Sequence, residues 1–254
     1  QAGFQICWAN EKDPAACRTY RHNLASAHLV EGDIRQISTS VIPKAPILAA
    51  GFPCQAFSIG GTQRGFADPR GTLFFEVLRV IDSVHPQIVF LENVENLMEH
   101  DHGRTFQVIY TSLAERGYVI HYRAMATHEY ANIPQTRRRI YIVATNNWQF
   151  SQRFSFPKPI PLTSTAISWI HQNVKQPDIY YYNHDTPFER YVRGTVTDYH
   201  YLYRIFNGTI RKQTNHKCPT LTASMCTPRN AALLRDHYGV RRLTLKESLA
   251  FQGF

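Results

Sequence analysis

The sequence has no uninterrupted apolar stretch of about 18 residues, which excludes a helix that crosses a membrane. Its five cysteines include no Cys-x-x-Cys pair, which argues against a disulfide scaffold or a zinc site built from thiolates. Internal repeats and low-complexity segments are also absent. A chain of 254 residues with these properties is predicted to be a globular protein of the reducing cytoplasm, without a metal. It lacks an initiator Met, and we expect it to be a fragment of a longer protein.

Acidic residues are scarce in the second part of the chain. Residues 1–146 contain 14 basic and 13 acidic side chains, whereas residues 147–254 contain 14 and 6. A nearly neutral part joined to a basic part predicts a chemical module attached to a module that binds a polyanion. The alternative is a soluble domain whose positive charge does not serve to bind a polyanion. Tyrosines and arginines interleaved after residue 180 fit either nucleic-acid contacts or the core of a small β-rich domain.

The first part alternates short apolar runs with amphipathic stretches. Strands are predicted at 5–9, 28–30, 46–50, 87–91, 118–123 and 139–144. Helix signals lie between them, including the Asp13-Pro14 start, the apolar spacing of 73–81 and the stretch 104–115. A capping box at Thr244 predicts a last helix. This alternation predicts an α/β fold with a doubly wound, parallel sheet.

Four predicted strands are followed by a residue that could do chemistry, namely Glu11, Asp33, Cys54 and Glu92. The carboxyl ends of strands in an open parallel sheet share one edge, where ligands bind. Each acid alone fits a loop or capping role better. Their shared position therefore favours a site at that edge.

Cys54 follows Pro53 in a turn rather than lying within an apolar stripe. We expect it to be partly exposed near a helix N-terminus, conditions that lower the pKa of a thiol and favour the nucleophilic thiolate. Burial is the commoner state of a free cysteine. The remaining cysteines are predicted to be structural: Cys7, Cys17, Cys218 and Cys226.

Three alternate residues near the last of these strands, Gln135, Arg137 and Arg139, would lie on one face of an extended chain. Arginines there would need carboxylates or phosphates as partners. On these residues alone, a strand edge held by ordinary salt bridges is the slightly favoured interpretation.

Together these residues resemble the cytosine-C5 DNA methyltransferases of prokaryotic type. The resemblance is carried by GFPCQAFS at 51–58, DPRGTLF at 68–74, FLENV at 90–94 and PQTRRR at 134–139, in the family's order and near its spacing. It implies a Rossmann-like methyltransferase sheet with a small, basic, β-rich target-recognition domain. The implied parts are a catalytic domain at 1–146, a target-recognition region at 147–217 and a return segment at 218–254. The family's first glycine-rich motif and final Gly-Asn motif are absent, so truncation at both ends is expected.

The chemistry implied by the resemblance is methyl transfer from S-adenosylmethionine to C5 of a flipped-out cytosine. Cys54 would supply the thiolate that adds at C6. Glu92 would hold the N3 and amino edge of the base, and Arg139 its carbonyl oxygen. Arg137 would orient the site beside Glu92.

The resemblance also assigns the cofactor site. Glu11 would bind the ribose hydroxyls, and Asp33 and Ile34 the adenine. Pro53 is placed in the same site. Lys12 follows the ribose-binding acid, where the family often has an aromatic residue.

Residues 58–71 resemble the family's mobile loop that closes over DNA. DNA contacts are implied for Gln55, Ser58, Gln63, Arg64, Arg70 and Thr220. The expected partners are double-stranded DNA and a cognate restriction endonuclease that acts on the same site. The protein is expected to be monomeric and associated with the nucleoid.

Two other functions stay open. One is an RNA cytosine-5 methyltransferase with the same motifs, as in a tRNA-modifying branch of the family. The other is a catalytically silent DNA-binding paralogue. The intact set of Cys54, Glu92, Arg137 and Arg139 argues against the second, because a silent binder has no need of the thiol.

Overall fold

The computed structural model describes residues 3–24, 28–53, 73–225 and 227–254. These residues form two compact units. The first unit contains residues 1–124 and 139–156, and the second contains 125–138 and 157–254.

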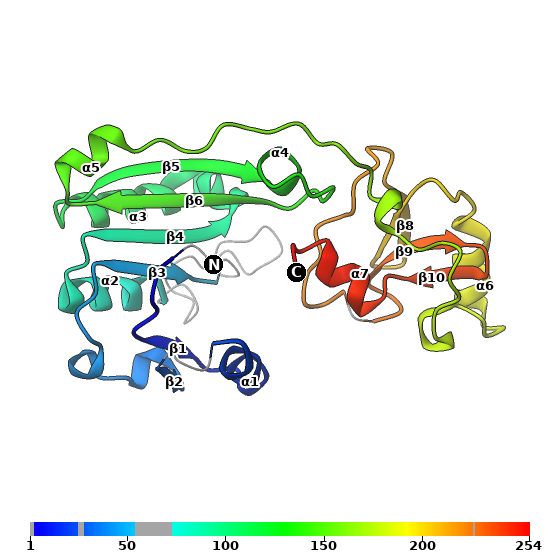
Figure 1. Cartoon of the computed structure of the whole chain (residues 1–254), viewed down its shortest axis with the longest axis horizontal. Helices are drawn as coiled ribbons and strands as arrows, with labels where there is room; N and C mark the ends of the chain where they lie inside the picture. The colour runs from blue at the N-terminus through cyan, green and yellow to red at the C-terminus, as the bar shows by residue number, and fades with distance from the viewer. Residues whose placement is uncertain (1–2, 25–27, 54–72, 226) are drawn as a thin grey trace. The chain divides into compact units, whose positions relative to one another are not determined.

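The first unit contains two described sheets. Its elements are β1 (Ala9–Glu11), α1 (Pro14–Asn23), β2 (Leu29–Glu31), β3 (Ile47–Gly51), α2 (Leu73–Val84), β4 (Ile88–Val94), α3 (Arg104–Ala114), β5 (Val119–Ala126), β6 (Arg138–Thr145) and α5 (Trp148–Arg153) (Figure 1). The last residues of β5 and the first residue of β6 are counted with the second unit. β1 pairs with β2 in parallel, and a separate four-stranded sheet has the order β3-β4-β6-β5. β3 is parallel to β4, whereas β6 is antiparallel to it.

The α/β class is therefore confirmed, and the larger sheet is mixed rather than parallel throughout. β6 returns from β5 through the short connection 127–137, which favours an antiparallel strand because a parallel crossover needs a covering helix. The predicted strand 5–9 is also shifted, since β1 begins at Ala9, opposite Leu29 of the three-residue β2. Cys7, which precedes this strand, is exposed rather than structural, while Cys17 is buried as predicted.

The core of the first unit lies between the larger sheet and the helices α2 and α3. Phe74 and Leu78 of α2 pack with Ile109 of α3 against Val89 and Leu91 of β4. Burying each such side chain stabilises the fold by about 1.5–3 kcal/mol. Successive residues of a strand point to opposite faces. Phe90 and Glu92 of β4 therefore face away from these helices.

The predicted helix ends are borne out by the caps. The Asp13 side chain accepts a hydrogen bond from the Ala16 N–H at 2.8 Å, with Pro14 in the first turn of α1. α2 ends at Val84, before His85-Pro86. Gly117, with a φ of 81°, follows α3 in the left-handed conformation that glycine adopts at low cost.

The second unit contains an antiparallel sheet with helices on both faces. Its elements are α4 (Thr127–Tyr130), α6 (Pro187–Thr195), β7 (Tyr203–Phe206), β8 (Thr209–Lys212), β9 (Ala231–Asp236), β10 (Gly239–Arg242) and α7 (Leu245–Ala250), with the strand order β10-β9-β7-β8. Leu233 of β9 packs with Val192 of α6, whereas the next residue, Leu234, packs with Phe251 after α7.

A buried ionic network links this sheet to α7. The Arg241 side chain is fully buried and donates to Asp236 at 2.6 Å and to both oxygens of Glu247 at 2.8 Å. Glu247 also closes the predicted capping box with Thr244. The sheet thus joins residues on both sides of the expected boundary at 217, and the three-part division stays a prediction. No helix in the described part of the chain is long and apolar enough to cross a membrane.

Candidate active site

The end of β3 leads into the segment that contains the predicted nucleophile. Gly51, the last residue of β3, pairs with Glu92 of β4. The following Phe52 is 6% exposed and packs against Phe74, with 5.5 Å between the ring centroids. Its carbonyl oxygen accepts a hydrogen bond from Asn93 Nδ2 at 3.1 Å. The backbone is therefore held on two sides where it enters the predicted nucleophile segment.

Glu92 and Arg139 meet on the sheet face that points away from α2 and α3. Arg139 pairs with Val94 across the antiparallel β4–β6 ladder, which places it diagonal to Glu92 on the same face. The Arg139 Nε atom lies 3.0 Å from Glu92 Oε1, and the two side chains are 15% and 34% exposed. A Cβ on Gly51 would lie 3.7 Å from Glu92 Oε2, so this carboxylate lies beside the end of β3.

The predicted row of alternate residues is divided between the units. Arg139 belongs to the first unit and pairs with a carboxylate, as expected. Arg137 and Gln135 belong to the second unit, where the Arg137 carbonyl accepts from the Thr127 N–H at 2.9 Å and Gln135 is 1% exposed. The role of Arg137 in orienting Glu92 stays a prediction.

The acids expected to bind the cofactor lie at the strand ends of the smaller sheet of the first unit, Glu11 in β1 and Asp33 two residues after β2. This corrects the expectation that all four strand ends share one sheet edge. Glu11 ends β1, and its Oε1 accepts from the N–H groups of Lys12 at 2.7 Å and Asp13 at 2.8 Å. The Glu11 carbonyl accepts from Gly32 N–H at 2.9 Å, which fixes the chain just before Asp33. Glu11 and Asp33 therefore belong to adjacent strand ends.

Asp33 is engaged by a neighbouring cation that the sequence reasoning did not consider. Arg35 donates through Nε to Oδ1 at 2.9 Å and through Nη2 to Oδ2 at 2.5 Å. These hydrogen bonds hold the pKa of the Asp33 carboxyl well below its usual range. The carboxylate is thus charged at neutral pH, and it also caps the short turn that begins at Ile34.

Asn93 and Asn10 are two further supporting residues that the sequence reasoning gave no role. Asn93 is 3% exposed and holds the Phe52 carbonyl. Asn10 donates to the carbonyls of Val30 at 3.0 Å and Gly32 at 2.9 Å, which joins the ends of β1 and β2. In the sequence Asn93 follows Glu92 and Asn10 precedes Glu11. This position beside a predicted site acid is the feature by which both supporting residues could have been found.

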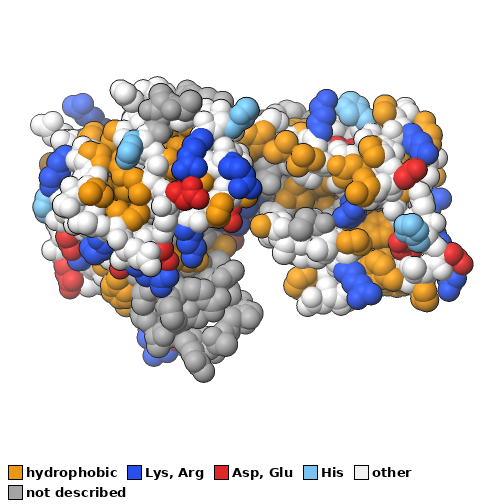
Figure 2. Space-filling view, turned by 90° about the horizontal axis from the view of Figure 1, so that it is seen from below, with side chains coloured by type: hydrophobic (Ala, Val, Ile, Leu, Met, Phe, Trp, Pro, Cys, Tyr) orange, Lys and Arg blue, Asp and Glu red, His pale blue; other side chains and the backbone are white. Residues whose placement is uncertain are grey.

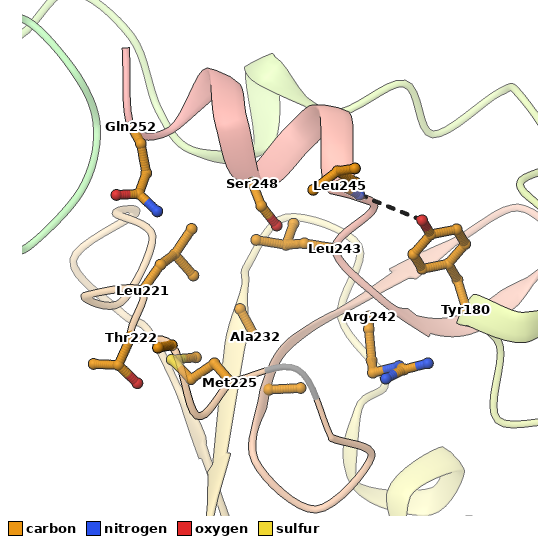
Figure 3. Close-up of a pocket in the computed structure, with 12 residues that line it drawn as sticks. Tyr180, Leu221, Thr222, Met225, Ala232, Arg242, Leu243, Leu245, Ser248 and Gln252 are labelled. Carbon is orange, nitrogen blue, oxygen red and sulfur yellow. Dashed lines mark hydrogen bonds between the residues drawn. The ribbon is translucent and has the colours of Figure 1, made fainter. Parts of the chain in front are cut away.

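The second unit has a pocket of about 300 Å³ beside α7 (Figure 3). Its wall includes Leu221, Met225 and Leu243, and the Tyr180 hydroxyl on its edge accepts from the Leu245 N–H at 3.5 Å. Among the described residues that line it there is no acid, histidine or cysteine. We therefore assign no chemistry to it. Thr220, predicted to contact DNA, precedes this wall and is half-buried.

Several predicted site residues lie outside the described residues. They are Cys54, Gln55, Ser58, Gln63, Arg64 and Arg70, together with the rest of the segment expected to close over DNA. Within the described ranges, no group of three or more His, Cys, Asp or Glu residues could hold a metal ion.

Comparison with known proteins decides the family. The sequence model of the C-5 cytosine-specific DNA methylases matches residues 1–254. The chain belongs to this family. This C-5 cytosine-specific DNA methylase is 41% identical over 254 residues to the type II methyltransferase M.Bsp6I of Bacillus sp., an alignment that covers 99% of this chain and 80% of that protein. It is 43% identical over 162 residues to M.HhaI of Haemophilus parahaemolyticus, covering 64% of this chain and 49% of that protein.

A solved structure shows the same fold. The Dnmt2 methyltransferase of S. pombe superposes with a TM-score of 0.68 at 18% identity, covering 100% of this chain and 80% of that one. The resemblance drawn from the motifs is thus confirmed, as is the Rossmann-like α/β class. As a C-5 cytosine-specific DNA methylase, the chain is a DNA (cytosine-5-)-methyltransferase, and the family implies S-adenosylmethionine as the methyl donor.

Proposed function

We propose that this DNA methylase transfers a methyl group to C5 of a flipped-out cytosine through a covalent bond between Cys54 and C6. The observation that carries the proposal is the Glu92–Arg139 pair, with 3.0 Å between Nε and Oε1. A carboxylate and a guanidinium here offer one hydrogen-bonding group for the amidine edge of cytosine and one for its carbonyl. They lie beside the strand end from which the chain runs into Pro53 and Cys54.

Covalent catalysis is needed because C5 of cytosine is a weak nucleophile. The Cys54 thiolate forms a bond to C6, and the electron pair of the C5–C6 double bond moves toward C5 and the ring. C5 would then take the methyl group from a bound donor, and the bond between the methyl carbon and the donor sulfur would break. A base removes the C5 proton, and the Sγ–C6 bond breaks to restore the double bond. S-adenosylmethionine, when bound, supplies an electrophilic methyl group.

We assign separate tasks to the residues around the base. Glu92 shares a proton with N3, accepts from the exocyclic amino group, and stabilises the charge that develops there when the thiolate adds. Arg139 donates to the carbonyl oxygen of the base. Arg137 orients the carboxylate. The flipped base costs a few kcal/mol of lost stacking, which such pocket contacts offset.

The residues of the smaller sheet fit a nucleoside. Glu11 would accept from the ribose hydroxyls, and its position is fixed by the two backbone N–H groups that bind Oε1. Asp33 and Ile34 would contact the adenine at the adjacent strand end. Pro53 and Lys12 would border the same site. Acids at the ends of neighbouring parallel strands are a common way to bind nucleotides in α/β sheets.

DNA would be held mainly by the basic part of the chain. We assign base and phosphate contacts to the region 147–217 and to Thr220, with further contacts from Gln55, Ser58, Gln63, Arg64 and Arg70. Figure 2 shows basic side chains interspersed with hydrophobic ones on the visible face of the second unit. Phosphate contacts of this kind make affinity fall steeply with salt.

The relatives are named type II methyltransferases. We therefore propose that this methylase acts as a monomer and protects the site that a cognate restriction endonuclease cuts. Digestion of methylated and unmethylated DNA by that nuclease tests the pairing.

The mechanism is tested with the full-length protein, labelled S-adenosylmethionine and a duplex that carries 5-fluorocytosine. Fluorine at C5 blocks the final elimination, so a covalent adduct should accumulate and should disappear in Cys54→Ser. Label on adenine, or on the exocyclic amino group of cytosine, would reject the mechanism. A parallel reaction with RNA decides between the two nucleic acids, and preferential labelling of RNA contradicts the proposal.

The role of Glu92 has its own test. Glu92→Gln should lower kcat by about 100-fold or more, the range expected of a group that acts in the transition state, with little change in DNA affinity. Glu99→Gln is the matched control, because Glu99 is an exposed carboxylate shortly after the same strand. Equal losses of kcat and of affinity in Glu92→Gln would remove the assigned role.

A further inference from the structure

A groove of about 480 Å³ lies on the second unit, outside the proposed chemistry. It is lined by Phe188 at the start of α6, by Phe206, Asn207 and Gly208 at the turn between β7 and β8, and by Arg229 and Asn230 before β9. These side chains include one cation, two amides, two aromatic rings and no acid. This composition suits a flat ligand that is rich in hydrogen-bond acceptors.

Arg229 is presented on a fixed turn. The Asn230 N–H donates to the Thr227 carbonyl at 3.1 Å, which closes a four-residue turn with Pro228 in its second position. Proline favours this position because its φ is already set for the turn. The hydroxyl of Tyr182, a residue only 2% exposed, donates to the Pro228 carbonyl at 2.7 Å and ties the turn to the core.

The Arg229 guanidinium lies over an aromatic ring and not beside a carboxylate. Its Cζ is 5.4 Å from the centroid of the Phe188 ring. Within the described part of the chain Arg229 forms no ion pair, whereas Arg190 on the same helix as Phe188 pairs with Asp185 at 2.9 Å. Stacking on a ring restricts the guanidinium plane and leaves its N–H donors available to a ligand.

The turn between β7 and β8 forms another part of the groove wall, and its conformation is fixed. Asn207 and Gly208 form a two-residue hairpin turn with φ of 49° and 75°, the positive values that match the twist of the paired strands. Phe206 beside this turn is 50% exposed, with the Arg204 guanidinium 5.3 Å from its ring centroid. A half-exposed ring on a fixed tip offers an apolar surface to a ligand.

The side-chain oxygen of Asn230, in the groove wall, accepts no hydrogen bond from the described residues. Asn230 Nδ2 donates to Ser224 Oγ at 3.1 Å, but among the described residues Asn230 Oδ1 is enclosed and has no partner. An unsatisfied polar atom is a cost to the free protein. A ligand that brings an N–H donor to this wall would remove that cost.

We propose that this groove reads base edges of the DNA target, with Arg229 recognising a guanine and Phe188 positioning the guanidinium. The inference rests on the proposed function. Guanine presents N7 and O6 in the major groove, and the planar fork of arginine binds both at once. Asn207 and Asn230 lie beside Arg229 to contact the adjoining base pair, and Phe206 packs against its apolar edge.

The test uses the full-length protein and a library of DNA duplexes randomised around cytosine. Methylated positions are read by bisulfite sequencing, and duplexes retained on the immobilised protein are sequenced separately. Arg229→Ala should reduce the preference for one guanine by about 5- to 150-fold, which equals about 1–3 kcal/mol at 1.4 kcal/mol per tenfold change. Preferences at the other positions should persist.

Two further variants separate recognition from a merely structural role. Phe188→Leu should weaken the preference for the same guanine. Phe188→Tyr should retain the wild-type preference, because the aromatic ring is kept. Lys246→Ala is the matched control, an exposed cation of α7 outside both the groove and the region 147–217, and should leave the whole target sequence unchanged. Urea unfolding of each variant checks that the second unit keeps its stability.

The outcomes are distinct. A uniform loss of methylation over all sequences in Arg229→Ala would assign the residue to a phosphate and overturn the inference, and so would an unchanged preference. If the wild-type protein methylates no cytosine, the proposed function fails. The retained duplexes still decide the inference in that case, because loss of one guanine preference on Arg229→Ala supports it and its persistence refutes it.

Discussion

Replacing Arg241 tests whether the buried ionic network holds the second unit together. The Arg241 side chain is 0% exposed and is shared between Asp236, at 2.6 Å, and Glu247, at 2.8 Å. Arg241→Met fills a similar volume but leaves both carboxylates buried without their cation. Removing one partner of a buried ion pair costs about 3–5 kcal/mol, which is a large share of a total stability of about 5–15 kcal/mol.

The loss can be measured by urea unfolding of a variant in which Trp169 is the single tryptophan. Trp169 stacks on Phe251, with 5.6 Å between centroids and 9° between planes, and Phe251 directly follows α7. Its fluorescence therefore reports on the unit that contains the network. Trp8 and Trp148 are replaced by phenylalanine in every protein compared.

Arg242→Met is the matched control. Arg242 is the next residue of β10, and its Nη2 donates to the Ile179 carbonyl at 2.9 Å in an exposed position. We expect the control to lose less than about 1 kcal/mol, as exposed contacts do. Equal losses in the two variants, or a loss below about 1 kcal/mol in Arg241→Met, would refute the reasoning that buried charge dominates here.

Three other outcomes follow from the described residues. Arg35→Ala should return the pKa of Asp33 to an ordinary value of about 4; an NMR titration would show the variant taking up a proton in mild acid where the wild type stays charged, and coincident curves would contradict the pairing. Burial raises the pKa of the Cys218 thiol far above its ordinary range, so iodoacetamide should alkylate the exposed Cys7 long before Cys218, as read by peptide mass spectrometry. Asn93→Ala removes the amide that holds the segment before the nucleophile and should lower kcat about tenfold or more with the KM for DNA nearly unchanged, whereas a change in KM alone would deny that role.

Local features were predictable because they depend on neighbours in the chain. Asp13 and Thr244 cap the helices that their spacing predicted. The motifs around Glu92 and Arg139 identified the family without any structure. The sequence also named both members of the central ion pair, although nothing local shows that two residues so far apart touch.

Strand pairing decided what the sequence left open. The contact between Glu92 and Arg139 needs β6 to run antiparallel beside β4 in one register, since a shift by one residue would turn Arg139 to the opposite face. The separation of Glu11 and Asp33 into a second sheet is likewise a matter of pairing.

The sequence by itself determined the helices α1, α2, α3 and α7, the charge division and the motifs that carry the chemistry, because each is written in adjacent or periodically spaced residues. Only the tertiary structure decided that Arg241 is buried between two carboxylates, that Arg229 lies over Phe188, and that Cys7 is exposed. These properties depend on which distant segments pack together. Such packing is set by the sum of many weak contacts over the whole fold.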